Sequence, residues 1–574
     1  VNSLELKKVY AHIHPDKKNL INYNFQFILD AFGGSSNSNS KNPAIQIKTI
    51  QLQDIRFFFD DLKGANYIGS LQQGSFKFKK TDFNAQAITI EALHLLGLNF
   101  NANLAAKQSQ AENETEKTVA PTQPWVIELN NFLLEKSAVD ICQKGDTTDQ
   151  SAIYVWKDIQ VGIPHLYWNG DSLAAKMQHI QGENAKGFQL RELSAELQFN
   201  NQLLQCEHLT ALTANSLINS NASIQFPDSL HSFSWQANLN DSKITLAELK
   251  SFSNALNELP NVELAIGGQF SGNKNNFKGK KIHLSTNNLA FDGDLRLKNF
   301  DDINNMLINF NAEKCTGTGA GIAAFIPQEE NKKLIRRIGQ FTANGQFNGF
   351  LQDFVANGNV HSDIGNIIAD LNVTINPSTG PHYDGKLEAS ELQLGTLLDN
   401  KEELGKLTCN VSLVADGWLS KNPKAQIEGD IIEVEAHHYA YHNINLDGTL
   451  QQKRFEGKVI ASDPHAKFNF EGKLNFADSI PTYDFQANVQ QVDLLALKIT
   501  SEELSINRGY IQLNARGKTV DDFEGTLDLT RFNLTKGNEN TSIQHLSLSS
   551  TEYKHSKRIE LKSDFINGSL NGSF

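Results

Sequence analysis

The chain has few cysteine, proline and methionine residues for its length. Its 574 residues include 4 Cys, 13 Pro and 2 Met. The cysteines, at Cys142, Cys206, Cys315 and Cys409, lie far apart and form no CxxC pair, which argues against a zinc ribbon or a thiol redox motif. We expect them to act as small buried hydrophobic residues, and the sequence leaves a disulfide open.

Long apolar runs and an excess of basic residues are also absent. No stretch reaches the ~18 apolar residues that a membrane-spanning helix needs, and no signal peptide precedes the first strand-like segment. The formal net charge is −13. This balance argues against a nucleic-acid partner, whose phosphates favour a basic face, and against simple adhesion to anionic lipid.

The common catalytic motifs are missing as well. No GxSxG, HExxH or P-loop occurs, and the GTGAG run at 317–321 lacks the following Lys-Ser/Thr of a phosphate-binding loop. His437, His438 and His442 fall in a strand-like segment, where His437 faces away from the other two, so three metal ligands do not converge. We therefore expect no enzyme activity, no cofactor and no metal.

What the sequence does contain is alternation of apolar and polar residues, which is clearest over residues 424–476 and is typical of half-buried β-strands. A pentad recurs in this region and elsewhere in the chain: an aromatic residue or Leu, an acid, Gly, any residue, then an aliphatic residue. Three copies begin within it, at Leu446, Phe455 and Phe470, and three outside it, at Phe291, Tyr383 and Phe523. In a strand the first, third and fifth residues share one face, so the pentads predict a long, one-sided sheet in which Gly marks bends or close approaches.

The one-sided pattern predicts an apolar lining for this sheet, with plain core packing as the alternative. Phe, Leu, Ile and Val on an uncovered face would solvate acyl chains, at roughly 0.8 kcal/mol per buried methylene. The candidate lining residues are Phe291, Leu295, Tyr383, Leu387, Phe455, Val459, Phe468, Phe470, Leu474, Phe476, Phe523 and Leu527.

The apolar phase slips by one residue within several strand-like segments. Ile50 and Leu52 take one phase and Ile55 and Phe57 take the other. Such slips fit β-bulges, which keep one face turned inward while a strand coils. With about fourteen residues per strand and turn, the chain supplies on the order of 35 strands.

Five segments follow from these patterns. Residues 1–104 are expected to form strands with an amphipathic helix over 15–33, and 105–124 a flexible polar loop. Residues 125–240 continue the sheet, 241–259 form an inserted helix that ends before Pro260, and 260–574 resume the sheet. The fold class is thus all-β: a long, coiled, open antiparallel sheet that forms a groove, with a few short amphipathic helices.

Taken together, the pentads and the slipping strands resemble the TamB/AsmA-like family of Gram-negative envelope proteins. Residues 24–32 and 45–60 carry the resemblance near the start, and 514–517 with 523–529 carry it near the end. The resemblance implies an inner-membrane anchor, a periplasmic β-groove, and a C-terminal segment that meets an outer-membrane barrel of the TamA type. The chain starts at Val1 and ends within the pattern at Phe574, so we expect a fragment without that anchor and that segment.

The resemblance also implies a function. It predicts a periplasmic protein that bridges the two membranes, binds phospholipid acyl chains, conducts phospholipid between the membranes and supports outer-membrane biogenesis. An alternative is a scaffold or chaperone for outer-membrane protein assembly that moves no lipid. A third hypothesis is an adhesin or a glycan-binding array of β-sandwiches. Clustered Trp residues would favour it, but the five Trp are mostly scattered.

Three tripeptides match an Asp-Ser-aliphatic pattern of O-glycosylation used in some Gram-negative envelopes. They centre on Ser172, Ser229 and Ser479. We expect added hexose mass in the intact protein if any of them is modified.

Overall fold

The structure is a computed structural model. It describes residues 2–15, 23–24, 47–61, 65–82, 85–104, 124–144, 150–227, 233–250, 257, 259–326, 329–376, 378, 380–417, 423–519, 522–553 and 556–572.

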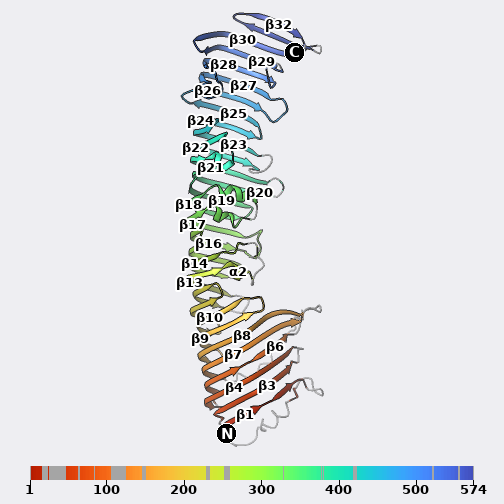
Figure 1. The fold of residues 1–574 in the computed structure, drawn as a ribbon, viewed down its shortest axis with the longest axis vertical. Helices are drawn as coiled ribbons and strands as arrows, with labels where there is room; N and C mark the ends of the chain where they lie inside the picture. Colours follow the sequence, from red (N-terminus) through yellow and green to blue (C-terminus); the bar gives the residue numbers. More distant parts are fainter. Residues whose placement is uncertain are drawn as a thin grey trace. The chain divides into compact units, whose positions relative to one another are not determined.

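Within these residues, 32 β-strands belong to one sheet (Figure 1). The strand count is close to the number that the sequence predicts, and the all-β fold class is confirmed. The chain divides into two compact units, one of residues 1–274 and 278–286, the other of residues 275–277 and 287–574. Each unit is described by itself.

Unit 1 holds strands β1 to β15, several of which are labelled in Figure 1. Their bounds are β1 Ser3–Lys7, β2 Tyr10–Ile13, β3 Thr49–Asp60, β4 Asn66–Asp82, β5 Ala87–Leu96, β6 Asn99–Leu104, β7 Val126–Lys144, β8 Gln150–Trp168, β9 Ser172–Asn184, β10 Gln189–Asn200, β11 Leu203–Thr213, β12 Leu217–Gln225, β13 Ser234–Thr245, β14 Glu263–Asn273 and β15 Asn276–Ser285, the last with its first two residues in unit 2.

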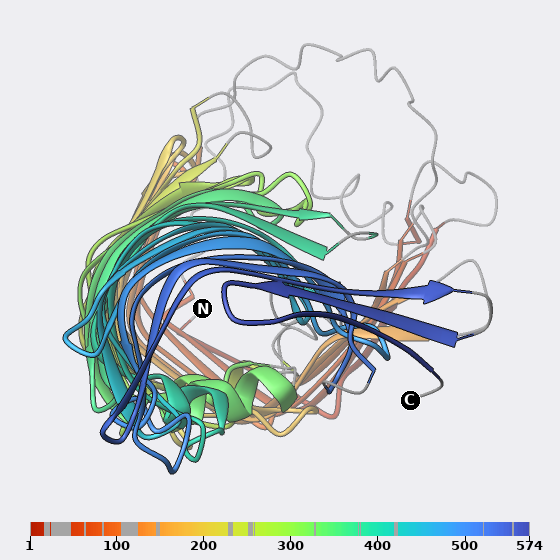
Figure 2. The same ribbon diagram turned by 90° about the horizontal axis from the view of Figure 1, so that it is seen from above.

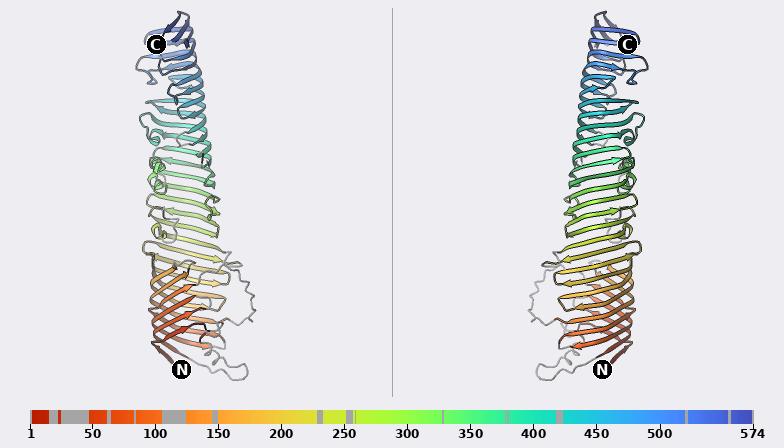
Figure 3. Two further views of the ribbon diagram at one scale, coloured as in Figure 1. Left: turned by 90° about the vertical axis from the view of Figure 1, so that its right-hand side faces the viewer. Right: turned by 90° about the vertical axis from the view of Figure 1, so that its left-hand side faces the viewer.

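Unit 2 is a meander in which each strand from β16 to β32 pairs antiparallel with the next (Figure 3). The bounds are β16 Leu289–Lys298, β17 Leu307–Thr318, β18 Gln340–Phe350, β19 Asp353–Ser362, β20 Gly365–Asn376, β21 Gly380–Gln393, β22 Leu404–Asp416, β23 Lys424–Ala436, β24 Tyr439–Gln451, β25 Arg454–Ser462, β26 Ala466–Asn475, β27 Thr482–Asp493, β28 Leu504–Arg516, β29 Glu524–Lys536, β30 Glu539–Tyr553, β31 Ser556–Ser563 and β32 Asn567–Gly572.

Unit 1 departs from the expected antiparallel order at two places. Strands β1 and β2 both run parallel to β3, and β5 and β6 both run parallel to β7. Parallel neighbours need a connection of a dozen residues or more. The polar segment predicted over 105–124 supplies that length between β6 and β7, although almost all of it lies outside the described residues.

Irregular backbone lies where the sequence slips phase. Asp54 has φ of 55°, and the pairing of β3 with β4 passes from Gln53 to Ile55 without it. The register with β4 is the same on both sides of Asp54, so the slip there is a local change of backbone conformation without an extra residue. In β5 the pairing skips Glu91 with a shift of register, which is a bulge of the predicted kind. Figure 2 shows the strands of each unit bending along their length.

The described helices are short and lie in connections between strands. They are α2 Leu246–Leu249, α3 Gly319–Ala323, α4 Glu329–Arg336 and α5 Leu394–Leu398. Asp241–Thr245, expected to open a helix, instead end β13, because their backbone groups pair with β14. The helix expected over 15–33 lies almost wholly outside the described residues, and Pro15 and Tyr23 form an isolated bridge.

Three of these helices lie along one edge of unit 2, which we call the helix rim. It comprises the turns at residues 319–339, 363–364, 394–403, 437–438 and 463–465. Among the described residues, no helix combines the length and the apolar character that crossing a membrane requires.

Candidate functional site

The strand register of unit 2 aligns alternate residues into rows that cross the whole meander. One row is Leu297, Ile308, Gly349, Phe354, Val373, Tyr383, Ala415, Ala425, Leu450, Phe455, Leu474, Tyr483, Ala515, Gly525, Ser550, Ile559 and Leu570. The next is Leu295, Phe310, Phe347, Ala356, Leu371, Gly385, Leu413, Ile427, Gly448, Gly457, Gly472, Phe485, Leu513, Leu527, Leu548, Leu561 and Gly568.

Two further rows lie nearer the helix rim. The third is Gly293, Ala312, Gly345, Gly358, Ala369, Leu387, Val411, Gly429, Leu446, Val459, Phe470, Ala487, Ile511, Leu529 and Leu546. The fourth is Phe291, Cys315, Ala343, Val360, Ile367, Ala389, Cys409, Ile431, Ile444, Ala461, Phe468, Val489 and Gly509. None of these residues is charged, and we call the face that carries the four rows the lining face.

Ten of the twelve predicted lining residues lie in these rows. All ten are half-buried. Phe523 precedes β29 and is also half-buried, whereas Phe476 follows β26 and is 47% exposed. Sequence reasoning expected these strands but did not single out their small lining residues or the leucines between serines in β30, because Ala, Gly and Ser blur the alternation.

Burial distinguishes the two faces of the sheet. Along β25, Phe455, Gly457 and Val459 are half-buried, whereas Glu456 and Lys458 between them are exposed. A flat single layer would expose both faces alike, so we infer that the lining face lies on the inside of the bend. Charged groups pair on the opposite face, where Lys473 Nζ lies 2.7 Å from Glu456 Oε1.

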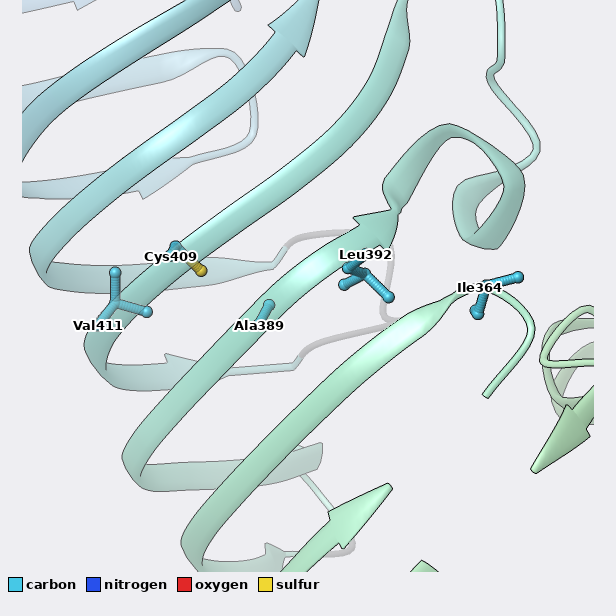
Figure 4. Packing of buried hydrophobic residues seen from close by; sticks show 5 residues of the cluster. All are labelled: Ile364, Ala389, Leu392, Cys409 and Val411. Atoms are coloured by element: carbon cyan, nitrogen blue, oxygen red, sulfur yellow. The ribbon is translucent and has the colours of Figure 1, made fainter. Parts of the chain in front are cut away.

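Among the described residues, little covers the lining face. The strands make their main contacts with their neighbours in the sheet. A buried cluster of Ile364, Ala389, Leu392, Cys409 and Val411 (Figure 4) lies where the lining face meets the helix rim. Most of the lining is therefore only half-buried.

Aromatic rings extend across several strands of the lining face. The rings of Phe455, Phe470 and Phe485 follow one another on β25, β26 and β27, with centroids 6.0 and 5.1 Å apart. Phe291 and Phe310 stack at 4.9 Å. Burial raises the pKa of the Tyr383 hydroxyl, which lies in the first row, so this face stays uncharged well above neutral pH.

Unit 1 carries rows of the same kind. One consists of Phe78, Ile90, Leu129, Leu166, Ala175, Leu197, Cys206, Ala222, Ala237 and Phe270. The rings of Phe59, Tyr67 and Phe100 stack across β3, β4 and β6, with centroids 5.8 and 6.3 Å apart. An apolar face is thus present in each unit.

The Gly-rich run and the histidines singled out in the sequence lie at a helix contact and in a turn. The GTGAG run lets α3 approach α4, because a Cβ on Gly319 would lie 2.0 Å from the Ile335 carbonyl oxygen. His437 and His438 form the turn between β23 and β24, with φ of 48° and 65°, rather than lying in a strand. Among the described residues, no group of three or more His, Cys, Asp or Glu could hold a metal ion.

The cysteines and the serines of the glycosylation pattern are scattered. All four cysteines are free, and Cys409 is buried. The Ser172 hydroxyl donates to Asn169 Oδ1 at 2.9 Å, and Ser479 lies in an exposed turn. Ser229 lies outside the described residues.

Comparison with protein-family models, with curated proteins and with solved structures gave no match.

Proposed function

We propose that this protein is a periplasmic β-groove of the TamB/AsmA-like kind, which conducts phospholipid between the inner and outer membranes. The observation that carries the proposal is the lining face: uncharged rows cross the strands of unit 2, and most of their residues are only half-buried. A surface of this kind is costly in water unless it has an occupant, because exposed contiguous apolar patches are rare on monomers.

Acyl chains suit this face better than a specific small molecule. The rows offer Phe, Leu, Ile, Val, Ala and Gly without a charged side chain, so a chain meets similar surroundings at each strand. Each buried methylene contributes roughly 0.8 kcal/mol, while the absence of charged side chains from the rows favours movement along the face. The phosphate head group stays in water at the edge of the sheet.

The wider role in the envelope belongs to the same proposal. Delivery of phospholipid would support outer-membrane biogenesis together with a barrel partner of the TamA type, and an inner-membrane anchor would hold the other end. In the alternative, the protein is a scaffold or chaperone that adds barrel strands to its sheet by β-augmentation and moves no lipid.

Site-specific crosslinking separates these functions. A photoreactive residue at Phe470, on the lining face of β26, should capture phospholipid in cells, whereas one at Lys473, on the opposite face of the same strand, should not. Capture from Lys473 alone would overturn the assignment of the faces. Crosslinks to unfolded outer-membrane proteins from either position, with no phospholipid, would favour the scaffold.

A further inference from the structure

Helix α4 carries basic side chains on an insert at the helix rim. The helix is part of the insert between β17 and β18, whose ends pair through Thr318 and Gln340. The close approach at Gly319 fixes its position against α3. The insert therefore lies on the helix rim at a defined place (Figure 1).

The two sides of this segment differ in polarity. Leu334 and Ile335 are half-buried, and Lys333 and Arg336 are exposed. Ile338, just after the helix, packs against the buried cluster that includes Ile364 and Val411. Leu387 of the third row packs against the same cluster, so apolar contact continues from the lining face to the base of α4.

The acidic groups described around α4 already have partners. Glu329 pairs with Lys332 at 2.6 Å, and its carboxylate also interacts electrostatically with Lys333 and Arg336. Asp399 pairs with Arg337 at 2.7 Å, and the same guanidinium donates to the Leu397 carbonyl oxygen. Among the described residues, Lys333 and Arg336 form no close ion pair of their own. Residues 329–337 hold four basic and two acidic residues, although the chain carries a net charge of −13.

On the basis of the proposed function, we propose that α4 is the docking site for the phosphate of a phospholipid whose acyl chains lie on the lining face. Charge complementarity supports an anionic occupant, and the apolar base of α4 supports one that also carries hydrocarbon. Two exposed basic side chains are few for adhesion to an anionic membrane, which uses clusters of about 4–8. A single head group needs no more than they provide.

The experiment uses the full chain and two lipids that share their tails. Detergent micelles carrying dioleoylphosphatidylglycerol or dioleoylglycerol are mixed with the protein, and bound lipid is counted by native mass spectrometry. The variant Lys333→Gln/Arg336→Gln should bind phosphatidylglycerol about 25-fold more weakly, at about fivefold for each basic residue. Its binding of dioleoylglycerol, which lacks the phosphate, should not change.

A matched control removes the same charge from the opposite edge of unit 2. Lys424→Gln/Lys453→Gln should leave binding of both lipids unchanged, because both lysines are exposed there without an ion-pair partner among the described residues. Unchanged phosphatidylglycerol binding by the α4 variant, equal loss of both lipids, or displacement of phosphatidylglycerol by inorganic phosphate would overturn the inference. If the wild-type chain binds neither lipid, the proposed function itself fails.

Discussion

Aromatic rings lie across glycines on the lining face. An added Cβ on Gly448 would lie 2.6 Å from the Phe455 ring, and one on Gly472 would lie 2.4 Å from Phe485 Cα. Gly472 also has φ of 153°, which other residues rarely adopt. Gly472 therefore serves both its own backbone conformation and the close approach of β27, whereas Gly448 makes room for a ring.

Gly472→Ala should destabilise β26 and β27 by about 1–3 kcal/mol, because it adds backbone strain and a clash. Gly568→Ala is the matched control, since an added Cβ there has no heavy atom within 4 Å. Hydrogen exchange of the amides in each region measures the effect. Equal protection in the Gly472 variant and the wild type would contradict this account.

A buried carboxylate on the helix rim should respond to acid. Asp463 is 1% exposed and accepts hydrogen bonds from the Tyr439 hydroxyl at 2.7 Å and from the backbone N–H of His465 at 2.8 Å and of His442 at 2.9 Å. Burial alone would raise its pKa, but these bonds outweigh burial, and the pKa is lowered.

A lowered pKa in the folded state means that this carboxylate stabilises the fold above the unfolded pKa of about 3.9. That contribution is lost as the pH falls through the lowered folded value. Asp463→Asn should cost about 1–3 kcal/mol at neutral pH and flatten the loss of stability in acid, measured by denaturation at a series of pH values. Asp370→Asn, at an exposed carboxyl, should change neither.

At the scale of the element, the bulges decide how each strand bends. Asp158, His208 and Asp241 have φ of 52°, 52° and 42°, and each lies at or beside a register shift between neighbouring strands. Such positions accept Asp, Asn and His more readily than β-branched residues.

Asp54→Val should therefore destabilise β3 by about 1–2 kcal/mol, because a β-branched residue is placed at a positive φ. Arg56→Val, two residues along the same strand, places Val in extended backbone and should be tolerated. Thermal unfolding of the two variants gives the comparison. Similar melting temperatures would show that this position is not under backbone constraint.

The sequence predicts these elements unevenly. Alternation reveals the strands, and the phase slip between Leu52 and Ile55 reveals the irregular backbone at Asp54, because both features keep apolar residues on one face. The parallel pairing of β1 with β3 depends on a contact across a long connection, which local pattern does not encode. The helix start at Asp241 is wrong because pairing with β14 extends β13 through Thr245.

At the scale of the molecule, the pentads predict which residues share the lining face. Strand register joins Leu295, Leu527 and their neighbours into rows, and register depends on turn geometry that the sequence shows only partly. The rows fix the chemistry of the face, whereas its occupant depends on molecules that the local pattern does not encode.

An uncovered apolar face should also bind a hydrophobic dye in the native state. Replacing Phe455, Phe470 and Phe485 by Ser should lower native-state fluorescence of anilinonaphthalene sulfonate at least twofold and weaken phospholipid capture, because it removes three neighbouring rings. Replacing Glu456, Glu471 and Gln486 by Ser changes the opposite face of the same strands and should leave both signals intact. Equal dye binding by the two triple variants would contradict the assignment of the apolar face.

Nearest-neighbour pairing in unit 2 also has a mechanical consequence. Each strand is held chiefly by the two beside it, so the meander resembles a linear array whose stability is a sum of local terms. A pulling force applied at its last strand would peel hairpins away one after another instead of rupturing the unit in one event. Single-molecule stretching should therefore record a staircase of small extensions.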